Sequence, residues 1–413
     1  MPARLYFVAS GLLIIGWIVS ACSAGPSVPT SAQLPVILEE PAPTAASSET
    51  ASPPLSPTSP ADDVPPSGAA SSFTTDFSKH TVAYTEIFSG GPPKDGIPAI
   101  DHPRFVSVSN ASEWLKPAEP VILVRVGEEA RAYPIQILMW HEIVNDTLGG
   151  IPLTVTFCPL CNTAIAFERT FESRVLDFGT TGRLRFSNLI MYDRQSETWW
   201  QQATGGAIAG ELSGARLAYY PASIIGWSEF AEAYPEGSVL SRDTGFERPY
   251  GRNPYTGYDD VNSSPFLYNG PETRGILPPM ARVLTIDLNG EAVAYSYETL
   301  QDVHVVNDTV GGTPVVVIWQ PGAASPFGSI PATGVGTVGS AEAYGREVDG
   351  QLLNFEFDGS QIRDQETGTT WNIFGLAEQG ELAGKQLPSL VTINHFWFSW
   401  AAFRPDTRVY GNP

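Results

Sequence analysis

Cysteine and positive charge are both scarce in this 413-residue chain, and each shortage excludes a class of protein. The three cysteines are Cys22, Cys158 and Cys161. A scaffold stapled by disulfides is excluded, because two cysteines three residues apart constrain almost nothing. Lys and Arg number 23 against 44 Asp and Glu, so the formal net charge is -21. Nucleic acid is therefore not an expected partner, since little basic surface exists to neutralise phosphates.

The first 72 residues are predicted to be a targeting segment followed by a tether. Residues 1–21 contain Arg4, an apolar stretch and small residues before Cys22, as a secretory signal peptide does. The four residues ending at Cys22 resemble the bacterial lipobox, in which that cysteine is lipidated. Residues 22–72 are rich in Pro, Ser, Ala and Thr and are predicted to be disordered. We therefore expect an extracytoplasmic lipoprotein, anchored to the bacterial membrane through Cys22.

The remaining chain contains an internal repeat. Val144–Pro152 recurs as Val306–Pro314, and two further blocks recur in the same order, Asp193–Trp200 as Asp364–Trp371 and Trp227–Val239 as Trp397–Val409. We predict an α+β, β-dominated fold that is a tandem duplication of one β-rich unit with a few short helices. Its parts are a first repeat (73–245), a connection rich in Tyr, Pro and Gly (246–280) and a second, degenerate repeat (281–413).

Short apolar runs bounded by Gly, Pro and Asn predict the strands of the first repeat. They are Val121–Val126, Ala130–Tyr133, Leu153–Phe157, Ala164–Phe167, Val175–Phe178 and Leu189–Tyr192. Helices are predicted near Pro134–Met139 and over Ala222–Ala233. The connection 246–280 has no such pattern, and a stretch of that length is often a lid or a cover.

Cys158-Pro-Leu-Cys161 lies between two apolar runs and is predicted to occupy the turn between two strands. Cys-x-x-Cys serves either as a redox dithiol or as half of a metal site. A comparison of the two repeats points to this turn. Cys158, Cys161 and His141 align with Gln320, Ala323 and Val303 in the second repeat. The chemistry is therefore expected in the first repeat.

Further motifs surround the pair: His141–Asp146, Ser187–Arg194, Trp200–Gln202 and Asn253–Tyr255. With Cys158–Cys161 they resemble the bacterial family called domain of unknown function 3179, over residues from about 95 to 409. The resemblance identifies a family rather than an activity. Some members are thought to carry selenocysteine in the cysteine motif, which implies redox chemistry. The chain departs mildly from the family pattern at Thr181 and Asn162, and both thiols remain.

Three interpretations of the site stay open at the level of sequence. In the first, Cys158 and Cys161 are the catalytic residues of a thiol-disulfide oxidoreductase, with His141 or Arg169 as a cation that lowers a thiol pKa. In the second, Cys158, Cys161 and His141 bind copper or zinc. Glu142, His102 and Met191 are then the reserve ligands. In the third, the protein is a non-enzymatic ligand-binding module with an aromatic platform.

Other side chains are candidates for a pocket because the second repeat lacks them. They are Arg185, Asn188, Tyr192 and Arg194, together with Glu142. Asp193 and Trp200 recur in both repeats and are predicted to be scaffold, a turn-capping carboxylate and a core indole. The sequence names neither a redox partner nor a small ligand.

His141 is predicted to join the cysteines through a β-hairpin. The turn residues Asn145–Gly150 separate His141 from the run that ends at Cys158. A turn centred on Thr147 and Leu148 sets His141 opposite a residue near Thr154. A slip, bulge or bend would then be needed to bring His141 to Cys158.

Overall fold

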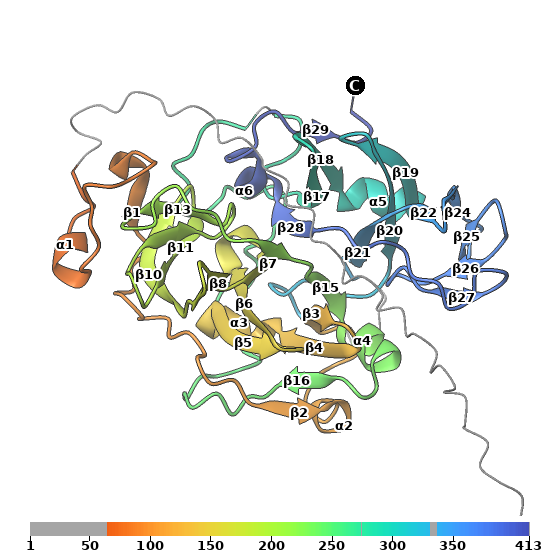
Figure 1. The fold of residues 1–413 in the computed structure, drawn as a ribbon, viewed down its shortest axis with the longest axis horizontal. Coiled ribbons are helices and arrows are strands. Elements are labelled where there is room, and N and C mark those ends of the chain that lie inside the picture. The colour runs from red at the N-terminus through yellow and green to blue at the C-terminus, as the bar shows by residue number, and fades with distance from the viewer. Residues whose placement is uncertain (1–63, 274, 331–336, 413) are drawn as a thin grey trace, which may run out of the picture. The chain divides into compact units, whose positions relative to one another are not determined.

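Short strands joined by tight turns make up most of the fold, because β-branched and aromatic runs in this chain are interrupted every few residues by Gly, Pro or Asn. The structure is a computed structural model that describes residues 64–273, 275–330 and 337–412 (Figure 1). The predicted α+β class with β dominance is confirmed. Within the described residues, no helix has the length and apolar character to cross a membrane. The signal peptide, Cys22 and most of the predicted tether fall outside these residues.

The end of the predicted tether belongs to the folded body. Helix α1 (Ala69–Ser72) begins after Gly68, whose φ of 74° is in the left-handed region. Ala69 is fully buried in a cluster with Phe73 and Trp199. Its small side chain fits closely against these rings, a contact that composition alone does not reveal. The folded part therefore starts before Phe73.

The first sheet of the first repeat is built on a hairpin of β3 (Pro120–Val126) and β4 (Glu129–Pro134). Its strand order is β15-β3-β4-β16-β2. The added strands are β15 (Ser223–Gly226), β16 (Ser238–Leu240) and β2 (Phe105–Ser107), and α2 (Val108–Ala111) follows β2. Helix α3 (Ile135–His141) follows β4 directly, close to where it is predicted.

One predicted helix is partly wrong. Residues 223–226 form β15, and helix α4 begins only at Trp227 and ends at Ala233. The β-branched Ile224 and Ile225 pair with Ile122 and Val121 on β3. Burial on a sheet favours such side chains in a strand, and this overrides the helical spacing of the apolar residues.

A second sheet runs through both repeats, in the order β29-β18-β17-β28-β7-β6-β5. Strands β5 (Ile143–Leu148), β6 (Ile151–Cys158) and β7 (Thr163–Glu168) come from the first repeat, and β14 (Tyr219–Tyr220) also pairs with β7. Strands β17 (Arg282–Leu288), β18 (Glu291–Ser296), β28 (Thr392–Phe396) and β29 (Arg408–Val409) come from the second. The two sets join where Asn394 on β28 pairs with Ala164 on β7 (Figure 1).

The second repeat forms corresponding elements. Its helices are α5 (Tyr297–Val303) and α6 (Trp397–Ala401), and its three-stranded sheet is β19 (Val305–Val310), β20 (Thr313–Gln320) and β21 (Ser340–Gly345). The indole of Trp200 donates to Asp193 at 2.9 Å, and that of Trp371 donates to Asp364 at the same distance. The prediction that Asp193 and Trp200 are scaffold is confirmed, because each aspartate also accepts from a turn N–H.

The two repeats differ in the length of one hairpin. In the first repeat it is long, with β10 (Phe178–Arg185) and β11 (Asn188–Asp193) in a sheet ordered β1-β10-β11-β12-β13. The predicted strand Val175–Phe178 is broken at Leu176 and Asp177, and β10 starts at Phe178. In the second repeat, β24 (Phe355–Phe357) and β25 (Ile362–Asp364) are short. Only the long hairpin extends to the cysteine pair.

The other elements are short. They are η1 (Tyr84–Glu86), β1 (Ile87–Ser89), β8 (Thr170–Phe171), β9 (Arg174–Val175), β12 (Trp199–Gln201), β13 (Gly206–Ala209), β22 (Glu347–Val348), β23 (Gln351–Leu352), β26 (Thr370–Trp371) and β27 (Ala377–Gln379). Two pairs of them, β8–β9 and β22–β23, form separate two-stranded sheets.

Candidate functional site

The cysteine pair lies at a hairpin turn, as predicted. Cys158 is the last residue of β6, residues Pro159–Cys161 form the 3₁₀ turn η2, and Asn162 closes it with a φ of 50°. β7 begins at Thr163, which pairs with Cys158. Side chains at positions i and i+3 eclipse in a 3₁₀ turn, so the two sulfurs lie on the same side.

Both sulfurs face one backbone oxygen. The Ser187 carbonyl oxygen lies 3.3 Å from Cys161 Sγ and 3.9 Å from Cys158 Sγ. Both cysteines are free thiols, with 2% of Cys158 and none of Cys161 exposed. Cys161 Sγ also accepts a hydrogen bond from Asn188 Nδ2 at 3.4 Å. The pair is therefore a buried dithiol held by the β10–β11 hairpin.

The hairpin turn that delivers this carbonyl is strained. Its central residues, Phe186 and Ser187, have φ values of 54° and 66°, the conformation that usually selects Asn-Gly. The Phe186 ring packs 5.5 Å from that of Phe403, and the Arg185 guanidinium lies 4.3 Å from the Phe186 ring centre. Strain of this kind persists where packing over-determines the backbone, and it is common at functional sites.

Glu142 is the titratable side chain that the structure brings to the pair. It ends α3 with a φ of 58°, and its carbonyl oxygen accepts from Phe157 N at 2.8 Å. Burial raises the pKa of Glu142 to about 8. Burial first, then the Cys161 thiol and the Glu142 carboxylate, raise the pKa of Cys158 well above its ordinary value.

His141 does not join the cysteines as the sequence predicts. Its Nδ1 lies 2.7 Å from the Pro98 carbonyl oxygen and its Nε2 lies 2.6 Å from the Tyr250 hydroxyl. Burial lowers the pKa of His141 to about 4, so the ring is neutral near pH 7. It therefore supplies no cation to a thiolate.

The physical reason is the end of helix α3. The β5–β6 turn is centred on Gly149 and Gly150, two residues later than expected, and Ile143 pairs with Thr156. If this pairing continued two residues beyond the strand, position 141 would face Cys158. His141 is, however, still helical, and the left-handed Glu142 turns the chain between the helix and the strand. Glu142 consequently approaches Cys158 and His141 points elsewhere.

The proposed metal ligands are also dispersed. In the described part of the chain, no three His, Cys, Asp or Glu side chains group closely enough to hold a metal ion. Of the reserve ligands, Met191 is fully buried in the apolar core, and His102 lines a surface pocket. Arg169, the other predicted cation, pairs with Asp177 at 2.7 Å.

The five predicted pocket residues separate into two groups. Asn188 contacts Cys161, and Glu142 neighbours Cys158. The other three form ion pairs and hydrogen bonds with acidic residues of the N-terminal segment. Arg185 pairs with Glu86 at 2.6 Å, Tyr192 donates to Asp95 at 2.5 Å, and Arg194 lies 3.0 Å from Asp95 and 3.3 Å from Asp101.

The connection between the repeats covers the pair, in agreement with the expected lid. Tyr258 donates its hydroxyl to the Leu160 carbonyl oxygen at 3.0 Å and accepts from Phe266 N at 3.1 Å. Ser187 Oγ donates to the Phe266 carbonyl oxygen at 2.7 Å. The cover is therefore fastened both to the turn between the cysteines and to the hairpin that faces them.

A buried polar network that the sequence did not predict lies behind the pair. Gln202 accepts from Asn188 Nδ2 at 2.8 Å and donates to Thr156 Oγ1 at 3.0 Å. Thr163 Oγ1 lies 2.8 Å from His395 Nδ1, on β28 of the second repeat. His395 is fully buried, its Nε2 has no hydrogen-bond partner, and burial lowers its pKa to about 3. One sign of this histidine was present in the sequence. When Trp227 is aligned with Trp397, His395 occupies the position of Ile225 in the first repeat.

The corresponding place in the second repeat contains a different set of side chains. Gln320, aligned with Cys158, donates to Glu229 at 2.5 Å, and Ser340 donates to the same carboxylate at 2.5 Å. Glu229 comes from α4 of the first repeat. An amide, a hydroxyl and a carboxylate thus fill the space, so the architecture does not require thiols there.

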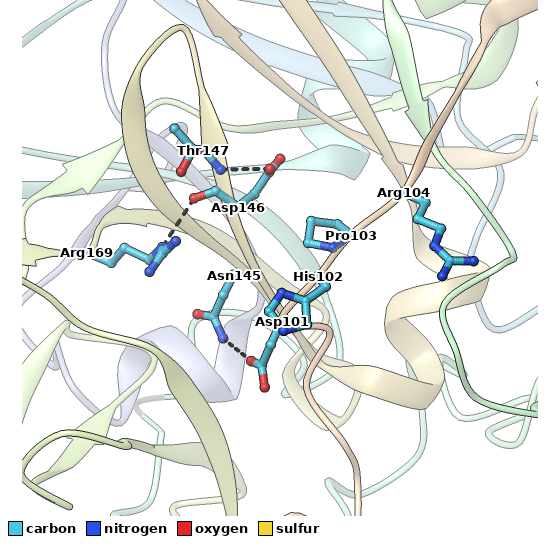
Figure 2. Close-up of a pocket in the computed structure, with 8 residues that line it drawn as sticks. All are labelled: Asp101, His102, Pro103, Arg104, Asn145, Asp146, Thr147 and Arg169. Atoms are coloured by element: carbon cyan, nitrogen blue, oxygen red, sulfur yellow. Dashed lines mark hydrogen bonds between the residues drawn. The ribbon is translucent and has the colours of Figure 1, made fainter.

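An open surface pocket of about 510 Å³ lies apart from the cysteines (Figure 2). Within it, Asn145 Nδ2 donates to Asp101 at 2.7 Å and Arg169 Nε donates to the Asp146 carbonyl oxygen at 3.2 Å. The Asp146 carboxylate pairs with Arg131 at 2.5 Å. These internal pairs leave the pocket without a convergent set of free polar groups. The lining residues are Asp101, His102, Pro103, Arg104, Asn145, Asp146, Thr147 and Arg169.

Comparison with known proteins agrees with the sequence motifs. The profile of a family described as "Protein of unknown function (DUF3179)" matches residues 94–407, which is most of the chain. No curated protein and no solved structure matches the chain.

Proposed function

The chain belongs to the DUF3179 family, and we propose that it is a thiol redox protein whose working group is the Cys158–Cys161 pair. The observation that carries the proposal is the placement of two free, buried thiols against one carbonyl oxygen, that of Ser187. A carbonyl oxygen accepts hydrogen bonds from S–H groups and offers no donor to stabilise the thiolates that would bind a metal ion. The arrangement therefore suits a dithiol that loses its protons on oxidation.

The residues around the pair support a proton-coupled reaction. Forming the disulfide removes one proton and one electron from each thiol. Glu142, beside Cys158, has a pKa of about 8 because of burial, so its carboxyl group exchanges protons near neutral pH. It also acts electrostatically on Cys158, so it suits the transfer of protons during the reaction of the pair. Ser187 and the Tyr258 cover hold the reduced pair out of water.

The metal alternative has less support, because His141 is engaged by Pro98 and Tyr250.

The test uses full-length protein purified without added metal, with elemental analysis and thiol counting in denaturant. We expect no stoichiometric copper or zinc, two reactive thiols in the body after reduction, and none after oxidation. The Cys158→Ser/Cys161→Ser double variant is the control. One equivalent of metal that this variant loses would refute the redox proposal.

The same experiment distinguishes the redox and metal-binding functions from a third one. A non-enzymatic ligand-binding module would contain neither bound metal nor a pair of thiols that change with redox conditions. Two thiols that stay reduced under oxidation, in a protein without metal, would favour that function instead.

We propose further that the protein works outside the cytoplasm, where disulfides persist, anchored by a lipid on Cys22. Cys22→Ser is expected to abolish incorporation of labelled palmitate and to release the protein from the membrane fraction. Ser27→Ala, a few residues downstream, is the matched control and should keep both label and membrane association. Retained label in Cys22→Ser would overturn this assignment.

A further inference from the structure

The two sulfurs of the pair have different surroundings, and Asn188 is the main cause. Its side-chain oxygen accepts from Gln201 Nε2 at 2.6 Å and from Ala203 N at 2.9 Å. The amide nitrogen therefore must face the other way, where it donates to Gln202 Oε1 at 2.8 Å and to Cys161 Sγ at 3.4 Å. Asn188 is fully buried, so this donor cannot turn to water. The Cys161 sulfur is thus held as a hydrogen-bond acceptor.

Cys158 has one hydrogen-bond donor, the Leu189 backbone N–H, which lowers its pKa, but its other neighbours oppose a negative charge. Glu142 adjoins it, and a carboxylate there repels a thiolate. Burial, Cys161 and Glu142 together raise the pKa of Cys158 well above its ordinary value. These neighbours favour the protonated form of Cys158.

The cover limits which oxidant reaches the pair. At most 2% of either cysteine is exposed, and Tyr258 and Phe266 are hydrogen-bonded over the turn. Attack on a protein disulfide requires the nucleophilic sulfur to approach a disulfide sulfur directly, which a buried thiol cannot do. A small, uncharged oxidant must also meet the sulfur directly, but it needs far less space than a protein disulfide does.

Building on the proposed redox function, we propose that Cys161 is the attacking sulfur, that Asn188 stabilises its thiolate, and that the oxidant is a small hydroperoxide. This assigns the second cysteine of the motif, rather than the first, as the nucleophile. Cys158 is then the resolving thiol.

The reaction balances with these groups alone. Cys161 loses its proton and its sulfur attacks the terminal oxygen of the hydroperoxide, the O–O bond breaks, and the alkoxide or hydroxide leaving group takes up a proton from the Glu142 carboxyl, which regains the one that Cys161 released. Cys161 becomes a sulfenic acid and the hydroperoxide is reduced by two electrons. Cys158 sulfur then attacks the Cys161 sulfur, and water leaves as the disulfide forms.

The assignment is tested by trapping the sulfenic acid in full-length protein. Cys158→Ser and Cys161→Ser are each treated with one equivalent of hydrogen peroxide and with dimedone, and the adduct is located by peptide mass spectrometry. We expect an adduct at Cys161 in Cys158→Ser and little adduct at Cys158 in Cys161→Ser. The reverse pattern, or equal adducts, would overturn the assignment.

The oxidant class and the role of Asn188 are tested by rates of disulfide formation. Hydrogen peroxide is expected to oxidise the pair at least about tenfold faster than oxidised glutathione at equal concentration. Asn188→Asp keeps the shape but removes the donor, and should slow oxidation by peroxide by about tenfold or more. Faster oxidation by glutathione disulfide, or an unchanged rate in a folded Asn188→Asp, would contradict the inference. If this variant does not fold, the dimedone pattern still decides the nucleophile.

These outcomes are distinct from failure of the proposed function. A pair that forms no disulfide with peroxide, glutathione disulfide or diamide would refute the redox function itself. A pair that forms a disulfide, but with the adduct on Cys158, would refute only the assignment of Cys161.

Discussion

Expressed separately, residues 64–275 and residues 276–413 are each expected to remain unfolded or insoluble. The second sheet is the reason, because β28 of the second repeat lies directly beside β7 of the first. Separation would leave β7 with an exposed edge and uncover Phe396 and Phe398, which are buried in the same core as Cys158. Each fully buried aromatic side chain contributes about 1.5–3 kcal/mol, and total stabilities are only about 5–15 kcal/mol.

Polar contacts between the repeats add to this dependence. Glu229 on α4 accepts hydrogen bonds from Gln320 and Ser340, and Ala324 N donates to the Ala118 carbonyl oxygen at 2.7 Å. A separated half would leave these groups without partners. Thermal unfolding followed by circular dichroism measures the effect, with co-expression of both halves as the control that should restore a folded complex. A soluble first half (residues 64–275) that unfolds cooperatively would refute the interdependence.

Raising the pH from about 4.5 to 8 is expected to destabilise the protein through two buried carboxyl groups. Burial raises the pKa of both Glu142 and Glu342 to about 8, whereas the ordinary value is 4.5. Between these values the folded state holds protons that the unfolded state has released. These two groups therefore lower the free energy of unfolding as pH rises through this window, and their effect levels off above pH 8. The buried His141 and His395, with pKa values of about 4 and 3, act in the opposite direction up to pH 6.5, so the net fall is concentrated between pH 6.5 and 8. Each group accounts for on the order of 5 kcal/mol.

Glu342→Gln tests the pH effect more clearly than a substitution of Glu142 would. Glu342 lies away from the cysteines, and its Oε1 has no hydrogen-bond partner. The variant should raise the free energy of unfolding at pH 8 by several kcal/mol (on the order of 5 at most) and change it little at pH 4.5. Urea denaturation across this pH range measures the effect. Glu347→Gln, at an exposed position of β22, is the matched control. Equal stability of Glu342→Gln and the parent at pH 8 would contradict the account.

Local sequence patterns predicted the elements close to the site. The apolar runs on either side of Cys158 and Cys161 predicted β6, β7 and the turn between them, and the repeat predicted scaffold residues such as Asp193 and Trp200. These features depend on neighbours along the chain, where periodicity and turn chemistry are informative. The misplaced start of α4 marks the limit, since pairing of Ile224 and Ile225 with β3 decided that segment.

The surroundings of the sulfurs depend on contacts between distant segments. Ser187 reaches the cysteines because its hairpin is longer than the corresponding hairpin of the second repeat, and nothing in the spacing showed where that turn would lie. His395 arrives on β28 from the far repeat. Glu142 replaces His141 because one left-handed residue reverses which side chain faces the strand. Such a conformation is uncommon for a residue other than glycine, so it could not be expected from the residue types alone.

The measurement that tests the central claim most directly is a redox titration of the full-length protein. The protein is equilibrated in buffers of varied reduced to oxidised dithiothreitol, quenched with an alkylating agent and analysed by mass spectrometry. We predict a reversible two-electron transition between the dithiol, detected as two alkylated cysteines, and the Cys158–Cys161 disulfide. The ratio of dithiol to disulfide should change tenfold for each change of about 30 mV in the potential of the buffer. A pair that stays reduced across the whole series and also after treatment with hydrogen peroxide, or that oxidises only irreversibly, would contradict the account.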